Sequence, residues 1–165
     1  LGLITPDVDA LRAQFDFPGM LVLQFAFDGD PGNLYLPHAH ARNAVVYTGT
    51  HDNDTTVGWF SELSEPQRDV VRAYLGRDGG DIAWDLIRAA LMSVADLAVV
   101  PFQDLLRLGT DARMNTPGLL GQNWAWRFRA EAMNGHVAGT MRHLTTLYDR
   151  MPAAHKQPKG APDPD

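Results

Sequence analysis

The feature that most constrains this chain is a set of three short apolar runs, at residues 20–26, 44–48 and 97–101. Strands that are covered on both faces of a parallel sheet have this composition, because neither side of the strand meets water. The stretches between the runs carry apolar residues at helical spacing instead. Strands that alternate with helices indicate parallel β/α units, so the sequence predicts an α/β fold with about three parallel strands.

The predicted helices begin at recognisable signals. Thr5 followed by Pro6 is a capping residue with proline at the first helical position, and Ser64 with Gln67 forms a capping-box pair. A closed eight-stranded barrel needs typically about 250 residues, so we interpret three β/α units as the C-terminal part of a (β/α)8 TIM barrel. The predicted helices cover residues 6–16, 55–62, 65–76, 81–95, 102–108 and 134–150.

Composition and charge exclude several classes of partner. The 165 residues carry a formal net charge of -6 and no run of Lys or Arg. Phosphate binding needs a clustered basic face, so no nucleic-acid partner is expected. No apolar stretch reaches the roughly 20 residues of a membrane-spanning helix, so no membrane partner is expected either. The chain contains no cysteine, which excludes disulfides and thiolate metal ligands and fits a cytoplasmic location.

The two ends of the chain differ in character. Residues 1–4 read LGLI, an apolar start that suggests a chain cut within a fold. Residues 152–165 are rich in proline and contain no aliphatic residue beyond alanine. Such a segment cannot bury enough surface to offset the entropy cost of ordering it. We therefore expect one domain over residues 1–151 and a disordered tail over residues 152–165.

The polar segment YTGTHDNDT, at residues 47–55, follows the second apolar run directly. Barrel enzymes place their catalytic groups at this end of their strands. Gly49 permits the close approach of backbone or ligand. Two structural interpretations compete with a functional one: Asp54 or Asp52 could cap the next helix, and His51 could be a hydrogen-bonded structural histidine.

Four ordered blocks of sequence resemble one enzyme family. THDNDT, at residues 50–55, looks like the hallmark of the amylomaltases, which are the 4-alpha-glucanotransferases of the alpha-amylase clan of retaining glycosidases. The blocks PGMLVLQFAF at 18–27, ARMNTPG at 112–118 and NWAWR at 123–127 are similar to that family as well. The resemblance extends from residue 1 to the end of the last predicted helix, and it too implies the C-terminal part of a barrel.

The resemblance implies a retaining double-displacement transfer of alpha-1,4-glucan segments to an acceptor sugar, without metal or organic cofactor. Such enzymes use a nucleophile and a general acid/base carboxylate roughly 5–5.5 Å apart, and the clan adds a third carboxylate that holds sugar hydroxyls and stabilises the transition state. By motif match, Asp52 is this third carboxylate. The resemblance also implies that His51, Asn53 and Asn115 bind substrate and that Phe25 lines an acceptor subsite.

The resemblance implies in addition that the two reacting carboxylates are missing from this chain. In the family, the general acid/base Glu lies in a short AEDLG-like motif just ahead of this point, and Leu1 and Gly2 look like its last two residues. The expected partners are therefore malto-oligosaccharides, other alpha-1,4-glucans and the N-terminal part of the same enzyme. The chain alone is expected to be inactive.

Two other functions stay open. His38 and His40 have the spacing of a two-histidine metal pair, which His51, Asp52 and Asp54 could complete in a metal-dependent hydrolase. A non-catalytic carbohydrate-binding fragment is the second alternative, because aromatic and amide contacts to sugar would survive without the reacting pair.

Four aromatic residues could either pack in the core or face a sugar. Phe25 and Phe27 lie near the end of the first apolar run, and we expect one to face outward and the other inward. Trp124 and Trp126 have the same spacing, which allows sugar stacking but is more often found in a half-buried pair.

Overall fold

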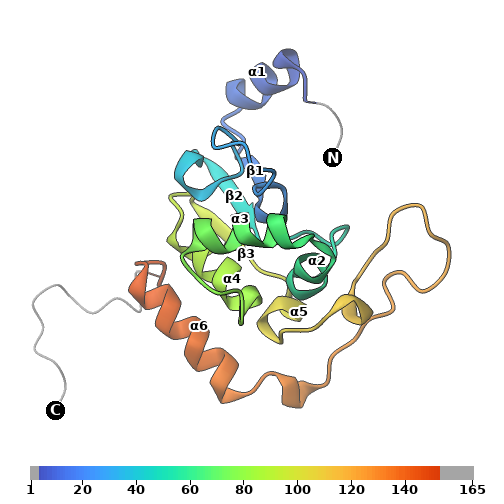
Figure 1. Cartoon of the computed structure of the whole chain (residues 1–165). Helices are drawn as coiled ribbons and strands as arrows, with labels where there is room; N and C mark the ends of the chain where they lie inside the picture. Colours follow the sequence, from blue (N-terminus) through green and yellow to red (C-terminus); the bar gives the residue numbers. More distant parts are fainter. Residues whose placement is uncertain (1–3, 153–165) are drawn as a thin grey trace, which may run out of the picture.

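The protein is described by a computed structural model over residues 4–152. Its sheet has the strand order β1-β2-β3, and both pairings are parallel (Figure 1). The last residues of the strands are register partners, Val22 with Tyr47 and Tyr47 with Val99, so the strands end together at one edge. The predicted α/β fold with three parallel strands is thus confirmed. The strands are β1 (Gly19–Val22), β2 (Ala44–Tyr47) and β3 (Leu97–Val99).

All of the predicted helices are present, most of them ending earlier than predicted. In α4, for example, Ser93 adopts extended backbone angles and ends the helix before the predicted residue 95. The capping box that opens α3 forms, since the Ser64 backbone N–H donates to Gln67 Oε1 at 3.0 Å. The helices are α1 (Pro6–Gln14), α2 (Thr56–Glu62), α3 (Glu65–Leu75), α4 (Ile82–Met92), α5 (Phe102–Leu105) and α6 (Gly135–Leu147).

The first strand is shorter than predicted. The apolar run from residue 20 to residue 26 continues past Val22 as a 3-10 turn over Leu23–Phe25, not as a strand. Leu23 and Gln24 are buried in this turn, and Gln24 donates from Nε2 to the Asp54 carbonyl oxygen at 2.9 Å. A buried turn and a buried strand have the same apolar composition, so periodicity could not separate them.

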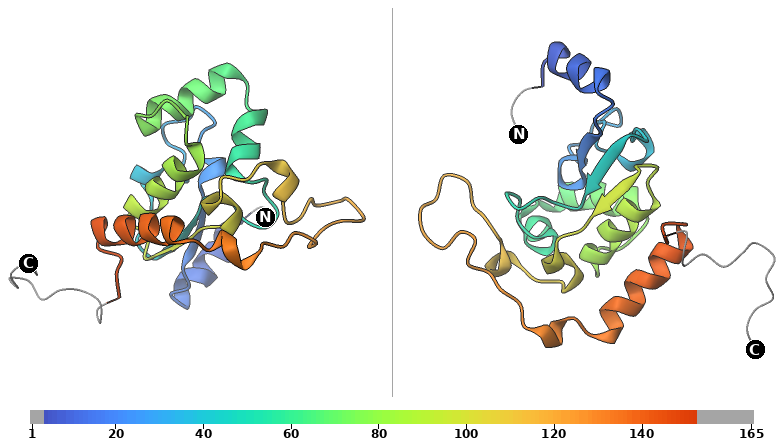
Figure 2. Two further views of the ribbon diagram at one scale, coloured as in Figure 1. Left: turned by 90° about the horizontal axis from the view of Figure 1, so that it is seen from below. Right: turned by 180° about the vertical axis from the view of Figure 1, so that it is seen from behind.

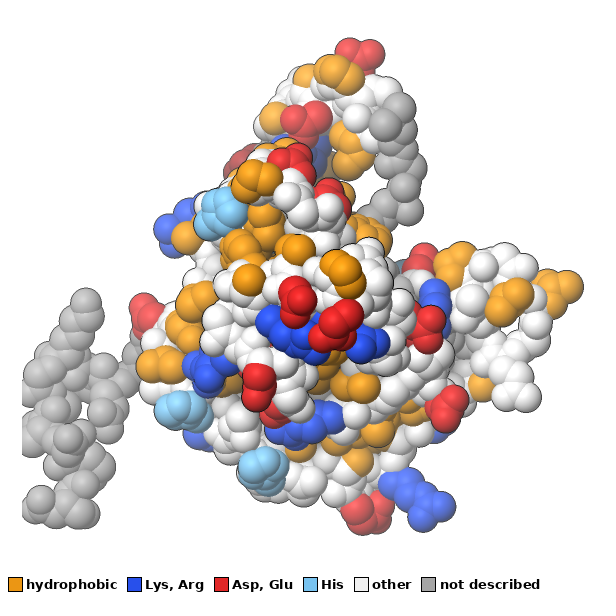
Figure 3. Space-filling view, in the orientation of Figure 1, with side chains coloured by type: hydrophobic (Ala, Val, Ile, Leu, Met, Phe, Trp, Pro, Cys, Tyr) orange, Lys and Arg blue, Asp and Glu red, His pale blue; other side chains and the backbone are white. Residues whose placement is uncertain are grey.

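Helices α2, α3 and α4 cover one face of the sheet and form the core with it (Figure 1). Val46 of β2 and Leu86 of α4 are fully buried there, together with Val71 of α3. The outer side of α3 is charged: Arg72 pairs with Glu65 and with Asp69, and these charges gather over α3 in Figure 3. The helical layer thus has the apolar inner face and polar outer face that an amphipathic helix requires.

The opposite face of the sheet has no helix over it within residues 4–152 (Figure 2, right). Met20, Leu97 and Val99 point to this face by register and are 41%, 59% and 46% exposed. Helix α1 is similarly uncovered, since it has no buried residue and its apolar residues Val8 and Leu11 are exposed. No helix in the described part of the chain is long and apolar enough to cross a membrane.

The ends of the chain lie mostly outside the described residues. The predicted disordered tail over residues 152–165 is described only at Pro152, and the apolar start only at Ile4. The limits of the domain, residues 1–151, therefore stay a prediction.

Candidate active site

The strand-end loop, which we define as residues 48–56, leaves β2 at the carboxyl edge of the sheet and ends in the first turn of α2. Thr48 and Thr56, its first and last residues, are fully buried. Thr55 caps α2, because its hydroxyl oxygen accepts from the Gly58 N–H at 3.1 Å. Asp54 does not cap α2 and instead accepts from the Thr110 hydroxyl at 2.8 Å and from the Thr55 N–H. The capping interpretation of Asp54 is therefore wrong.

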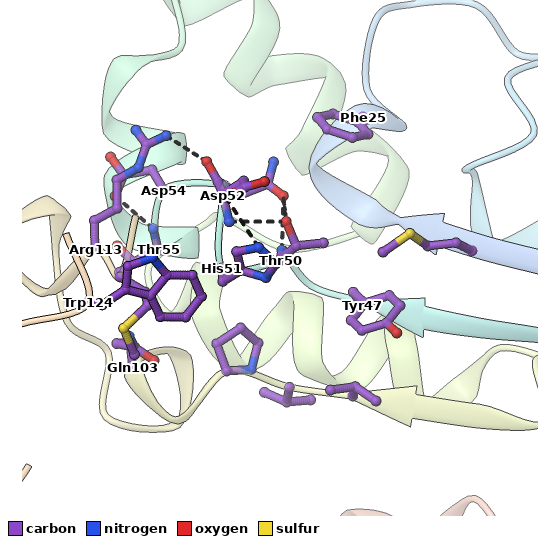
Figure 4. A pocket seen from close by; sticks show the side chains of 17 residues that line it. Phe25, Tyr47, Thr50, His51, Asp52, Asp54, Thr55, Gln103, Arg113 and Trp124 are labelled. Carbon is purple, nitrogen blue, oxygen red and sulfur yellow. Dashed lines mark hydrogen bonds and ion pairs between the residues drawn. The ribbon is translucent and has the colours of Figure 1, made fainter. Parts of the chain in front are cut away.

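A cavity of about 720 Å³ opens beside this loop at the carboxyl edge of the sheet (Figure 4). Three predicted site residues of the loop, His51, Asp52 and Asn53, line it together. Phe25 lies across the cavity from them and is 43% exposed, whereas Phe27 is buried; both lie beyond the end of β1, so strand alternation does not set their directions. The remaining lining residues are Met20, Tyr47, Gly49, Thr50, Asp54, Thr55, Val99, Val100, Pro101, Gln103, Arg113, Met114 and Trp124.

Asp52 is half exposed and is held by two predicted site residues. Its Oδ1 accepts from Asn115 Nδ2 at 2.6 Å and lies 3.3 Å from His51 Nε2. Arg113 donates from Nη2 to the Asp52 backbone carbonyl at 2.7 Å. The structure therefore brings Asn115 to Asp52 from a segment 63 positions further along the chain, although Asn115 does not itself line the cavity.

Asn53 lines the cavity but also holds the turn of its own loop. Its Oδ1 accepts from the Thr50 N–H at 2.9 Å and from the Thr50 hydroxyl at 2.7 Å. Gly49 is required for a steric reason, because a Cβ atom at this position would lie 2.6 Å from Gln24 Nε2. The local sequence thus folds into a tight turn that leaves Asp52 at its exposed side.

Asp104 lies beneath the loop and was not predicted as a site residue. It is 1% exposed and accepts from the hydroxyls of Thr48, at 2.6 Å, and Thr56, at 2.8 Å. The Thr56 N–H donates to its other oxygen at 2.8 Å. Burial raises the pKa of the Asp104 carboxyl above its ordinary value, and these hydrogen bonds oppose that rise. The sequence feature that could have indicated Asp104 is its position, as an acidic residue just past the third apolar run.

Trp124 forms one wall of the cavity beside His51. The two rings are 5.0 Å apart between centroids and inclined by 38° (Figure 4). Trp124 has a left-handed backbone, with φ of 64°, which is costly for a residue that has a Cβ. Its N–H donates to the Met114 carbonyl at 2.7 Å. Trp126 instead packs against Phe128, so the two tryptophans differ in environment.

His38 and His40 do not join His51 and Asp52. His38 lies beside Tyr74, with Nδ1 at 3.0 Å from the tyrosine hydroxyl. His40 is buried, and its Nε2 lies 2.8 Å from the Tyr35 carbonyl oxygen. Across residues 4–152, no three His, Asp or Glu side chains are grouped so that they could hold a metal ion. The geometry therefore does not favour the metal-dependent hydrolase.

Comparison with known proteins decides the family. Residues 1–133 match the family model described as 4-alpha-glucanotransferase. The chain belongs to this family. The 4-alpha-glucanotransferase of Synechocystis is 54% identical over 154 residues, which cover 91% of this chain and 30% of that protein. The 4-alpha-glucanotransferase of Thermus thermophilus is 44% identical over 160 residues, covering 92% of this chain and 32% of that protein.

A solved structure of the same enzyme class has the same fold. The amylomaltase of Streptococcus agalactiae, in complex with acarbose, matches with a TM-score of 0.86 and 34% identity, covering 91% of this chain and 31% of that protein. This member of the 4-alpha-glucanotransferase family thus spans only about a third or less of the length of the relatives it matches.

Proposed function

We propose that this chain is the C-terminal part of a 4-alpha-glucanotransferase that moves alpha-1,4-glucan segments to an acceptor sugar by retaining double displacement. Family membership and the names of the relatives support the activity. The single observation that carries the proposal is the position of Asp52 of the THDNDT block, half exposed in a cavity at the carboxyl edge of the sheet. A structure similar to this chain is an amylomaltase with acarbose bound.

Asp52 is the transition-state stabiliser in this proposal. Among the residues that the structure describes, Asp52 and Asp54 are the two carboxylates that line the cavity. Both oxygens of Asp54 are engaged by donors of the protein, from Thr55 and Thr110. Asp52 can therefore accept hydrogen bonds from sugar hydroxyls beside the reacting carbon, while Asn115 orients its carboxylate. A negative charge placed there stabilises an oxocarbenium-like transition state more than the ground state.

The other predicted residues surround the same sugar. His51 and Asn53 bind substrate hydroxyls from the loop, and Asn115 contributes its amide through Asp52. Phe25 faces the loop across the cavity, which suits an acceptor sugar packed on its ring. The reaction needs no metal ion or organic cofactor, because two carboxylates and protein hydrogen bonds supply the chemistry.

The N-terminal part of the same enzyme is the proposed partner. It would cover the bare apolar face of the sheet and complete a (β/α)8 barrel, in which that face is filled with side chains. It would also supply the nucleophile and the general acid/base. A cytoplasmic location stays a prediction, because a relative from Arabidopsis thaliana is chloroplastic/amyloplastic.

Glucose release from maltotriose tests the proposal in two proteins. One is the 165-residue chain alone. The other, which we call the joined enzyme, is the Synechocystis relative with its matching segment replaced by this chain. We expect no release from the chain alone. In the joined enzyme we expect Asp52→Asn to lower kcat by about 100-fold or more and to change KM by less than about threefold.

Glu62→Gln, at the exposed end of α2, is the matched control and should retain the kcat of the joined enzyme. An equal change of kcat and KM in Asp52→Asn would contradict the role of Asp52. Release by the chain alone that disappears in Asp52→Asn would mean that the reacting carboxylates lie within this chain.

A further inference from the structure

Asp104 cannot touch a substrate in the cavity. It is 1% exposed, lies in the short helix α5 after β3 and is not among the lining residues. A buried carboxyl group is costly unless its hydrogen bonds are satisfied. The contacts that satisfy Asp104 come from both ends of the strand-end loop: Thr48 directly follows β2, and Thr56 begins α2.

The contacts join the two ends of the loop through one side chain. Thr48, the first loop residue, donates its hydroxyl to Asp104 Oδ2, and Thr56, the last, donates its hydroxyl to the same oxygen. The Thr56 N–H donates to Oδ1 at 2.8 Å. Both threonines are fully buried, so water cannot replace these bonds. The distance between the loop ends is thereby set by the carboxyl group.

Asp52 is four positions from each of these ends, and its own side chain is held more weakly. The Asp52 carboxylate is 49% exposed, and its hydrogen-bond partner Asn115 lies in a segment without buried residues. Gln24 adds one further tie, from Nε2 to the Asp54 carbonyl. The position of the Asp52 backbone therefore depends on the two ends of the loop, on this hydrogen bond and on Arg113, which donates to the Asp52 carbonyl at 2.7 Å.

We propose that Asp104 is a positioning residue for the transferase reaction, which holds both ends of the strand-end loop so that Asp52 meets the reacting sugar correctly. The proposal rests on the proposed function, since it assigns Asp104 an effect on catalysis through Asp52. A displacement of about 1 Å in a catalytic group can cost about 100-fold in rate. Loss of the Asp104 contacts should lower kcat and leave KM nearly unchanged, because Asp52 stabilises the transition state more than the bound substrate.

The test compares substitutions at Thr48 in the joined enzyme. Thr48→Val keeps the branched shape but removes the hydroxyl that donates to Asp104, whereas Thr48→Ser keeps the hydroxyl. We expect Thr48→Val to lower kcat for maltotriose by about tenfold with KM within about twofold, and Thr48→Ser to restore kcat to within about twofold. Folded fraction is measured for each variant by thermal unfolding, and kcat is expressed per folded molecule.

Substitutions at Asp104 provide the second comparison. Asp104→Asn can still accept from the Thr56 N–H and donate to the two hydroxyls, so it should lose less activity than Asp104→Ala, which removes every tie. We expect kcat to fall by about 30-fold in Asp104→Ala. Asp85→Asn is the control, since Asp85 is a largely buried carboxyl in α4 that faces Arg77 and not the loop.

The outcomes separate this proposal from the proposed function. If Asp52→Asn abolishes turnover while folded Thr48→Val and Asp104→Ala keep the parent kcat, the positioning role is overturned and the transferase function stands. A rise of KM as large as the fall of kcat, or a failure of Thr48→Ser to restore kcat, would also overturn it. If Asp52→Asn itself has no effect, the proposed function fails first.

Discussion

The strand-end loop and the later segment that contacts it at Asp52 differ in how they are held to the rest of the molecule. The loop has buried residues at both ends and is tied to Asp104 and Gln24 in the core. The outer segment, which we define as residues 113–128, has no buried residue and projects from the body of the molecule (Figure 1). Its hydrogen bonds are local except for those that Arg113 and Asn115 make to Asp52.

The comparison teaches that a segment can resemble the family in sequence without being held by the core of this chain. Both regions carry blocks that resemble the family, THDNDT in the loop and ARMNTPG at the start of the outer segment. Only the loop is held by the core of the described chain. The outer segment reaches the site through Asp52 itself and through the contact of Trp124 with His51. Substitutions should therefore change global stability in the loop and only local order in the outer segment.

The largest effect is expected from Gly58→Ala, beneath the loop. Helix propensity alone would make alanine more stable than glycine in α2 by about 1 kcal/mol. A Cβ atom at position 58 would lie 2.5 Å from Thr110 Oγ1 and 2.6 Å from Asp54 Oδ2, so these two hydrogen-bonded side chains must shift. We expect a net loss of about 2 kcal/mol in the free energy of unfolding, measured with urea.

The control for this substitution is Gly139→Ala in α6. A Cβ atom there has no heavy atom within 4 Å. Helix propensity should then be the main effect on the free energy of unfolding, and the variant should be more stable by up to about 1 kcal/mol. If both variants were stabilised, the packing beneath the loop would be looser than described.

A smaller effect concerns pH and the Asp104 carboxyl. Because burial raises its pKa in the folded protein, the folded state keeps this proton to higher pH than the unfolded chain does. The free energy of unfolding should therefore fall as pH rises from about 3.8 through the raised pKa, and then level off. Asp104→Asn does not titrate and should lack this fall. Urea unfolding of both proteins across this pH range measures the difference, and parallel curves would contradict the expectation.

In the outer segment, Asn123→Ala should loosen the segment and leave the rest of the molecule unchanged. Asn123 accepts from the Thr116 N–H and donates to the Thr116 and Leu119 carbonyls. Its loss should lower the free energy of local opening by about 1 kcal/mol. Hydrogen exchange read by mass spectrometry should speed up in residues 113–128 only. Faster exchange in residues 48–56 as well would mean that the two regions are coupled.

The smallest effect is expected at the tip of the outer segment. Leu120 is fully exposed and packs against nothing that would be lost in Leu120→Ser. The free energy of unfolding should change by less than about 0.5 kcal/mol. A larger loss in urea unfolding would place Leu120 in a contact, and the contrast between the two regions would weaken.

Local patterns predicted the strands and the helices, whereas the family resemblance indicated His51, Asp52, Asn53 and Phe25, which line the cavity. Gly49 was predicted to permit a close approach, and in the structure Gln24 lies against it. Asp104 could not be predicted, because its hydrogen bonds to residues 48 and 56 span 56 and 48 positions of the chain. The contact between Trp124 and His51 depends on a left-handed backbone at a bulky residue, which no propensity would suggest.

The long span of the Asp104 contacts also sets the order in which this site can assemble during synthesis. Chains emerge from the ribosome beginning at the N-terminus. The loop at residues 48–56 therefore emerges first, with its two buried threonines lacking their acceptor until residue 104 follows. Strand β3 and helix α5 must emerge before the loop can close. The strand-end loop consequently matures only after residue 104 has been made, although its own residues are made earlier.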